Sequence, residues 1–387
     1  MSVLTSRPAL RWLVPAVAAV TVIGGSLVGT LVASADPTLP PRSAAQLLVD
    51  VQNARVDALS GTVVQRADLG LPRLPGLGRG GSADLTSLIS GSNTLRVWYA
   101  GPDRARIALL GTLGETDVIR DGTNAWIWQS HDNTATHLTL PANQKRPPGV
   151  HALPTPLPSG LPGGLPSAMP SSPQEAADMA LRALDPSTVV TTAGSAKVAG
   201  RSAYELVLAP RDTASLVGQV RLAIDATEHV PLRVEVFARN ATKPSFEVAF
   251  QQISFQRPAA EWFRFNPPPG ARVHEETAQG RSPAPTPSVR PRTTVIGQGW
   301  TSVLVARPPT SDGGARAGGR YADAGPGALG GLLAQLPTVS GSWGSGRLLS
   351  GNLFSVLLTD DGRVLAGAVS PDRLYRAAAD PAARLDR

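Results

Sequence analysis

The residues best suited to chemistry lie in one stretch, DGTNAWIWQSHDNTATHL, which runs from Asp121 to Leu138. His131 and His137 flank a predicted hairpin turn, so they could face each other across it and bind a metal ion. Asp132 is the only acid close by, and a metal site needs one or two further ligands. Two exposed histidines near a turn are the simpler explanation, and we predict no metal site here.

Other motifs that resemble metal-binding, phosphate-binding or catalytic signatures are weak. Asp360-Asp361-Gly362 resembles part of a metal loop, but a hairpin turn explains it. The GLGRGG stretch at 76–81 lacks the preceding strand and following helix of a phosphate-binding loop. The chain has no cysteine, which excludes disulfides, thiolate zinc sites and thiol catalysis, and it has no serine hydrolase or zinc protease signature. We therefore expect a binding protein without a cofactor, and not an enzyme.

The tryptophans of the same stretch suggest binding instead. Trp126 and Trp128 share one face of their predicted strand, and Trp98 is expected on a neighbouring strand. They either fill a core or line a cavity. Two apolar stretches rich in Pro and Gly, 69–92 and 153–172, interrupt the strands and could cover an opening. A covered apolar cavity suits a lipid ligand.

The charge of the chain argues against nucleic acid as a partner. The formal net charge is +7, with 36 basic residues against 29 acidic ones. A basic balance can indicate nucleic acid or an anionic surface. The arginines are scattered along predicted strands and are not clustered with aromatic residues, so we expect no nucleic-acid binding.

The N-terminus carries a membrane-targeting segment. Arg7 and Arg11 precede an apolar run from Trp12 to Ala33. The run is long enough to span a bilayer, and Ala33-Ser34-Ala35 resembles a signal peptidase site. Residues 1–35 are therefore either a cleaved signal peptide or a retained anchor. Both place the rest of the chain outside the cytoplasm, on the outer face of the cytoplasmic membrane or secreted.

The elements that position these residues begin with a helix over 40–61, capped by Ser43. Strands follow, with hairpin turns at Gly101-Pro102-Asp103, Asp121-Gly122 and Asp132-Asn133. A short helix is expected after Ser172, and further strands cover 201–273. Near Gln251 the apolar alternation changes parity, which predicts a β-bulge.

A proline-rich linker and a small second unit complete the chain. The small unit is expected to contain a strand near 293–307, a helix near 329–337, a hairpin turning at Asp361-Gly362, and a last short helix. The predicted organisation is a targeting segment (1–35), a half-barrel domain (36–275), a linker (276–292), a small C-terminal domain (293–378) and a tail (379–387). The fold class is α+β, with about ten antiparallel strands in a curved sheet covered by helices.

Four motifs in this order resemble the LolA-type lipoprotein carriers and the related RseB/MucB regulators. They are LRVWYAGPDRARI, VIRDGTNAWIWQSHDNTATHLTL, YELVLAPR and FRFNPPPGARV, which together span most of 43–273. The resemblance implies an incomplete β-barrel closed by helices over a cavity that holds acyl chains. Candidate cavity residues are Trp98, Trp126, Trp128, Tyr204, Leu206, Val220, Leu222, Val234, Val236 and Phe250.

The resemblance leaves two functions open. The first is an extracytoplasmic carrier or chaperone for lipid or lipoprotein acyl chains, which could work with an ABC transporter. The alternative is an envelope-stress sensor like RseB, whose partner is a membrane anti-sigma factor. The linker and small second unit favour the sensor, whereas the cavity candidates favour the binder, which we rank first.

Overall fold

The computed structural model describes residues 39–71, 91–111, 114–140, 172–174, 177, 187–277, 292–307 and 336–384. The predicted targeting segment 1–35 and most of the two Pro- and Gly-rich stretches lie outside the described residues, as does most of the predicted linker. The second predicted helix is represented only by 172–174 and 177, and the helix near 329–337 only by its last two residues. Within the described ranges, no helix has the length and apolarity needed to cross a bilayer.

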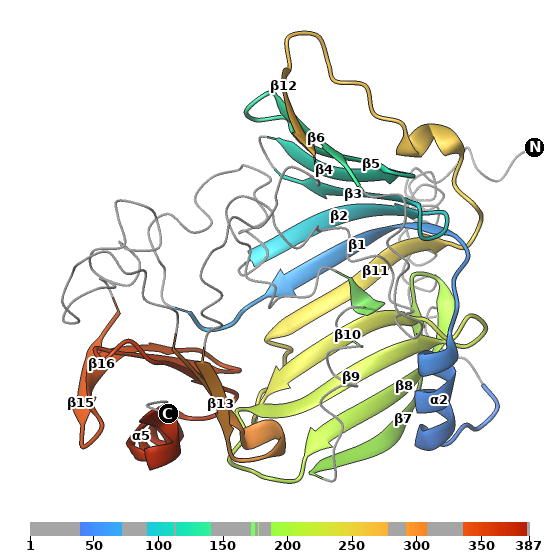
Figure 1. Ribbon diagram of the computed structural model, residues 1–387. Helices are drawn as coiled ribbons and strands as arrows, with labels where there is room; N and C mark the ends of the chain where they lie inside the picture. Colours follow the sequence, from blue (N-terminus) through green and yellow to red (C-terminus); the bar gives the residue numbers. More distant parts are fainter. Residues whose placement is uncertain are drawn as a thin grey trace, which may run out of the picture.

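Twelve strands form one large sheet (Figure 1). The strands are β1 (Leu59–Ala67), β2 (Gly91–Tyr99), β3 (Arg104–Leu110), β4 (Glu115–Asp121), β5 (Asn124–Gln129), β6 (Thr134–Thr139), β7 (Thr188–Val198), β8 (Arg201–Pro210), β9 (Val217–Asp225), β10 (Pro231–Ala238), β11 (Phe246–Ser254) and β12 (Arg272–Thr277). Their order is β12-β6-β5-β4-β3-β2-β1-β11-β10-β9-β8-β7. The end strands β12 and β7 do not pair, so the sheet is open and does not curl into a barrel.

Two features of the sheet differ from the expectation. Strand β12 pairs with β6 in parallel, with Arg272 opposite Thr134, whereas all strands were expected to be antiparallel. The chain between β11 and β12 crosses the sheet before β12 begins, which allows the parallel direction. Strand β7 was not predicted, because its middle residues are small, polar and exposed and show no apolar alternation.

The first helix is shorter than predicted. Helix α2 covers Ala44–Asn53, and Ser43 and Gln46 form a capping box at its start, as the predicted Ser43 cap requires. The prediction extended it to residue 61, but β1 begins at Leu59. Leu59 and the residues that follow belong to the strand and not to the helix, which is why the helix was predicted too long.

The seam between the two halves of the sheet is the pairing of β1 with β11. Opposite β1, the register shifts between Gln252 and Phe250, so Gln251 is the extra residue. This confirms the predicted bulge near Gln251. The predicted hairpin turns between β2 and β3, β4 and β5, and β5 and β6 are also confirmed.

A second, six-stranded sheet contains the C-terminal residues. Its order is β13-β14-β18-β17-β16-β15. The elements are β13 (Arg292–Ile296), η5 (Gly299–Thr301), β14 (Val303–Arg307), β15 (Thr338–Gly341), β16 (Gly344–Ser350), β17 (Ser355–Thr359), β18 (Val364–Gly367), α5 (Pro371–Ala379) and η6 (Pro381–Arg384). Helix α5 packs on one face through Leu374, Ala377 and Ala378, together with the buried Ala383 of the predicted tail.

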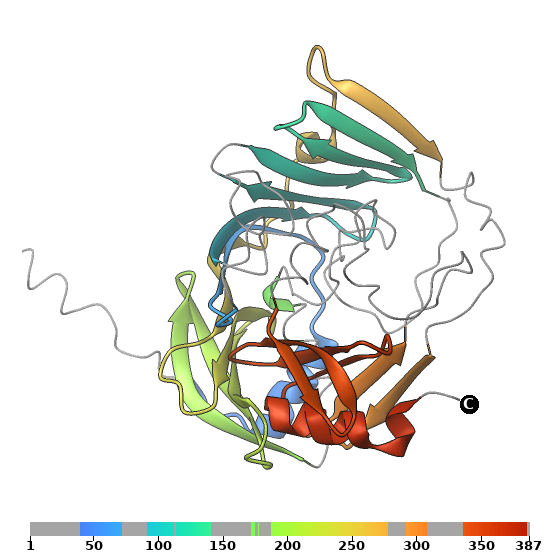
Figure 2. The ribbon, with the colours of Figure 1, turned by 90° about the vertical axis from the view of Figure 1, so that its left-hand side faces the viewer.

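The two sheets touch through backbone and side-chain contacts. The Leu216 amide donates to the Ala368 carbonyl at 2.8 Å, and the Trp300 indole donates to Thr188 Oγ1 at 2.8 Å. In a second place, the backbone N–H of Asn352 donates to the Leu69 carbonyl at 2.7 Å. The small sheet is therefore fixed against the large one at more than one point (Figure 2).

Candidate functional site

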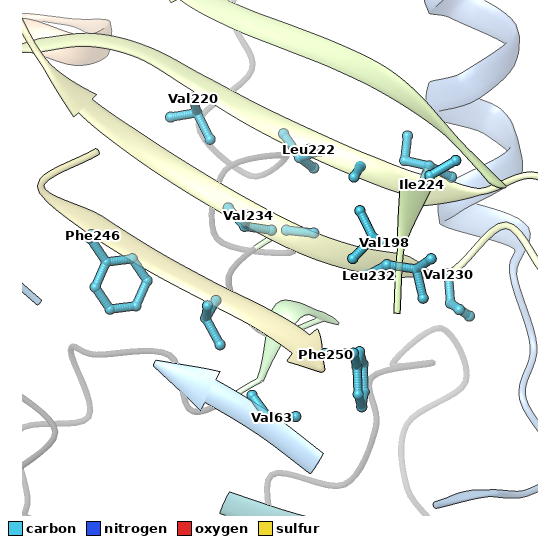
Figure 3. Close-up of a cluster of buried hydrophobic side chains, with 14 of the residues drawn as sticks. Val63, Val198, Val220, Leu222, Ile224, Val230, Leu232, Val234, Phe246 and Phe250 are labelled. Carbon is cyan, nitrogen blue, oxygen red and sulfur yellow. The ribbon is translucent and has the colours of Figure 1, made fainter. Parts of the chain in front are cut away.

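One side of the large sheet, here called the inner face, is largely apolar from β3 to β8, although it includes the buried polar residues Gln65 of β1 and Asn93 of β2, which hydrogen-bond each other. Cross-strand pairing places Val63, Leu95 and Leu109 in one row, and Val248, Val234, Leu222 and Leu206 in another. Leu206 and Leu222 are 0% exposed. These side chains belong to one buried cluster (Figure 3).

Seven of the ten predicted cavity residues lie on the inner face. They are Tyr204, Leu206, Val220, Leu222, Val234, Val236 and Phe250, and all belong to the inner-face cluster or pack against it. The Tyr204 hydroxyl donates to the Pro40 carbonyl at 3.0 Å, which satisfies its polar end.

Described residues of other elements also pack onto the inner face, among them Trp300, Phe354 and Ala368. Helix α2 contributes Leu47 and Val51 at the β7–β8 end. Leu69 packs onto the face from the connection after β1, and the loop residue Leu353 packs onto it from the small sheet. The described helix therefore covers only one end of a broad apolar face.

The three predicted tryptophans lie on the opposite side, here called the tryptophan face. Trp98 pairs with Arg106, Arg106 with Ile119, and Ile119 with Trp126, so these side chains form one row. Trp128 follows Trp126 at a spacing of two and shares its side. The ten candidates therefore do not line one surface. Trp98 is also not on a strand that neighbours β5, because β3 and β4 lie between β2 and β5.

Aromatic side chains from the segment after β11 cover the tryptophan face. Trp262 of η4 (Ala260–Phe263) stacks on Trp98 with ring centroids 5.0 Å apart. Phe265 contacts Trp126 and Trp128, with centroids 5.2 and 5.8 Å apart. The segment continues into β12, so it straps β2–β6 on this side (Figure 1). The tryptophans are thus held by this strap.

Trp262→Ala is expected to lower the free energy of unfolding by about 1 kcal/mol. An offset aromatic pair contributes about that much beyond its area, and Trp262 is 41% exposed. Urea unfolding followed by circular dichroism measures the change. Val49→Ala removes an apolar side chain of α2 that is 54% exposed and should have little effect. An unchanged midpoint for Trp262→Ala would show that the strap does not depend on this stack.

A buried pair of polar side chains lies on the same face. Arg106 hydrogen-bonds Asp117 of β4, its guanidinium carbon lies 5.3 Å from the Trp98 ring centroid, and Asp117 is 2% exposed. Burial raises the pKa of Asp117 to about 7, and a contact with Glu115 adds to this, while Arg106 acts in the opposite direction. The pair packs beneath aromatic rings, so water reaches it poorly.

The two histidines do not come together. His131 lies exposed at the β5–β6 turn, whereas His137 is in β6, stacked on Trp126 with centroids 4.2 Å apart. His137 Nδ1 lies 2.7 Å from Glu275 Oε2 and Nε2 lies 3.1 Å from Asn124 Oδ1. The contact with Glu275 connects β12 to β6. Across the described ranges, no three His, Cys, Asp or Glu side chains gather as metal ligands do.

Sequence reasoning missed the strap and the Arg106–Asp117 pair. A signal for the pair was present, because Arg106 and Asp117 interrupt the apolar strands RARIALL and ETDVIRD. Trp262 and Phe265 lie in EWFRF, which gives no indication of the strand that they cover.

Solved structures similar to this chain include two kinds of protein. The chain is similar to MucB. A Pseudomonas aeruginosa MucA/MucB complex aligns at 16% identity and a TM-score of 0.40, covering 87% of this chain and 96% of that one. MucB in complex with MucA(peri) gives 16% and 0.41, covering 87% and 97%. A LolA superfamily protein from Nitrosomonas europaea gives 10% and 0.20, covering 58% and 99%.

Both protein groups named from the sequence motifs are among these structures. No family model matches the chain, and no curated protein matches it significantly. With TM-scores of 0.41 and below, the similarities carry no argument about function. Function is therefore argued from the geometry of this chain.

Proposed function

We propose that this chain is an extracytoplasmic, non-enzymatic binding protein that holds the acyl chains of a lipid or lipoprotein against the inner face of the large sheet. The observation that carries the proposal is the extent of that face, which is largely apolar from β3 to β8, while the described helix packs at one end. Such a face suits a ligand without polar groups.

The energetics favour a long acyl chain. Each buried CH₂ group contributes about 0.8 kcal/mol, so a long chain offsets the cost of ordering the segments that enclose it. The tryptophan face is not part of the proposed site, because the strap already occupies it. The seven inner-face candidates are therefore the proposed lining.

The N-terminal run 12–33 supports the proposed location. It delivers the chain across the cytoplasmic membrane, either as a signal peptide or as an anchor on the outer face. Both locations bring the inner face within reach of lipid. Mass spectrometry of the mature N-terminus distinguishes them.

Val236→Asp is expected to raise the Kd for a fluorescent long-chain fatty acid at least tenfold, because it places a carboxylate on the inner face at a half-buried position. Native mass spectrometry of the wild-type chain should show a co-purifying lipid. Val207→Asp is the matched control, since Val207 is a half-buried valine of β8 on the opposite side. Equal affinity of both variants, or a wild-type chain that binds neither fatty acid nor lipidated peptide, would contradict the proposal.

The second candidate is a sensor whose partner is a membrane anti-sigma protein. The small sheet favours it, because a second unit fixed to the first through Trp300 and Leu216 provides a surface that a simple carrier does not need. Pull-downs with the full chain that recover no membrane regulator would exclude this role.

A further inference from the structure

The small sheet has a face that α5 does not cover, here called the open face. Val303 and Val305 of β14 and Leu365 of β18 point to α5, so their neighbours along each strand point the other way. Val295 and Leu304, which pair across β13 and β14, are 59% and 47% exposed. Two large apolar side chains therefore lie side by side in solvent.

The exposed pair belongs to a longer row. Leu304 pairs with Ala366, Ala366 with Val356, and Val356 with Leu349, so one apolar row crosses five strands. Neighbouring strands lie about 4.8 Å apart, which makes the row about 19 Å long. The next row along the strands, Ala306, Val364 and Leu358, is apolar as well.

The open face is continuous with the inner-face cluster of the large sheet. Phe354 and Ala368 lie one residue beyond the paired Ser355 and Gly367, and strand alternation places them on the same side as Val356 and Ala366. Both pack against the inner-face cluster. In both views α5 lies on the side of the small sheet away from β1–β6 (Figures 1 and 2). The apolar surface thus runs from one sheet onto the other.

We infer that the open face is the second wall of the acyl-binding site, and that an acyl chain lies along the row from Leu349 to Val295. This inference rests on the proposed function and extends it to the small sheet. The row is long enough for the ligand, because one leaflet of a hydrocarbon core about 30 Å thick holds an extended acyl chain of about 15 Å.

The backbone of the sheet favours an acyl chain over a peptide. Strands β14, β18, β17 and β16 are each hydrogen-bonded on both sides, so the middle of the open face has no free backbone donors or acceptors. A peptide lying across it would bring N–H and C=O groups onto an apolar row without partners, at a cost of several kcal/mol. An acyl chain has no such groups.

Leu304→Asp and Val295→Asp test the inference in the full chain. Each is expected to raise the Kd for a fluorescent long-chain fatty acid at least tenfold, and both sites are exposed enough to keep the fold. Val49→Asp on α2 is the matched control, since Val49 is 54% exposed and should leave the Kd unchanged. Wild-type affinity in both open-face variants overturns the inference and leaves the proposed function intact. A wild-type chain that binds no fatty acid overturns both.

A single label identifies the occupant, because the chain has no cysteine of its own. Leu304→Cys carrying an environment-sensitive dye should emit as in water and shift to the blue when the fatty acid is added. Emission that is already blue and unaffected by fatty acid shows that another part of this chain occupies the face. A shift produced by an apolar peptide but not by fatty acid identifies a protein partner. Either of these results overturns the inference.

Discussion

The thermal stability of this chain is expected to fall as the pH rises from about 4 to about 7, and Asp117→Asn is expected to flatten that fall. The pKa of Asp117 is raised from 3.8 to about 7, mainly by burial. Between these values the folded chain holds the proton and the unfolded chain has released it. The stabilisation is complete below the unfolded pKa and is lost as the pH passes the folded pKa.

The size of this effect is large for one side chain. A difference between 3.8 and about 7 corresponds to about 4 kcal/mol at most. Glu115 on the same strand and Arg106 on β3 are the charged neighbours that face Asp117, whereas β5 presents Trp128. Asparagine keeps the shape of the protonated acid, so the variant should match the wild type below about pH 4, where the wild-type carboxyl is protonated in both states, and exceed it by a growing margin from pH 5 to pH 8.

Melting temperatures at pH 5 and pH 8 provide the measurement. Asp132→Asn is the control, because Asp132 is exposed at the β5–β6 turn and its replacement should leave the pH slope unchanged. If Asp117→Asn and the wild type have the same slope, the buried carboxyl is already ionised near neutral pH and Arg106 outweighs burial.

Arg363→Ala is expected to destabilise the small sheet by about 1–3 kcal/mol, the usual cost of leaving a buried hydrogen-bonding group without its partner. Arg363 is 3% exposed. Its Nε donates to Asp361 Oδ2 at 2.7 Å, and its Nη1 donates to the Ala378 carbonyl at the end of α5 at 2.9 Å. Burial alone would raise the pKa of Asp361, but hydrogen bonds from Arg363 and Thr359 outweigh it and hold that pKa below its ordinary value.

Urea unfolding of the full chain tests this expectation. The signal of Trp343, which stacks on Tyr375 of α5 with centroids 5.7 Å apart, reports on the small sheet. Arg376→Ala on the same helix is the control, because Arg376 is exposed and makes only a 3.5 Å contact with the Asp372 carbonyl. Similar losses in both variants would mean that Arg363 does not hold α5 in place.

Local patterns predicted the hairpins and the bulge, because turn residues and strand alternation act over a few positions. The turn at Asp361-Gly362 is one case: Gly362 has φ of 88°, which glycine adopts without strain. Alternation also placed Trp126 and Trp128 on one side. The alternation did not indicate which face of the sheet carries the two tryptophans, because Ala125 and Ile127 on the opposite face are apolar as well.

The remaining features depend on contacts between distant segments. The strap that carries Trp262 covers strands more than a hundred positions earlier, and no local pattern in EWFRF encodes this. The parallel direction of β12 likewise follows from where the strap ends. The open face of the small sheet was not predicted, because Val295 and Leu304 become neighbours only when β13 and β14 pair.

The seam and the last strand of the large sheet also set the order in which the chain can fold. Arg66 and Glu247, which join β1 to β11, are 181 positions apart, and His137 and Glu275 are 138 apart. Closing such long loops is slow, so a sheet of this topology folds late. Until β11 and β12 have been synthesised, β1 and β6 present unpaired edges to other chains. The interval between synthesis of the first half and arrival of residue 277 is therefore the period in which this protein most needs a chaperone.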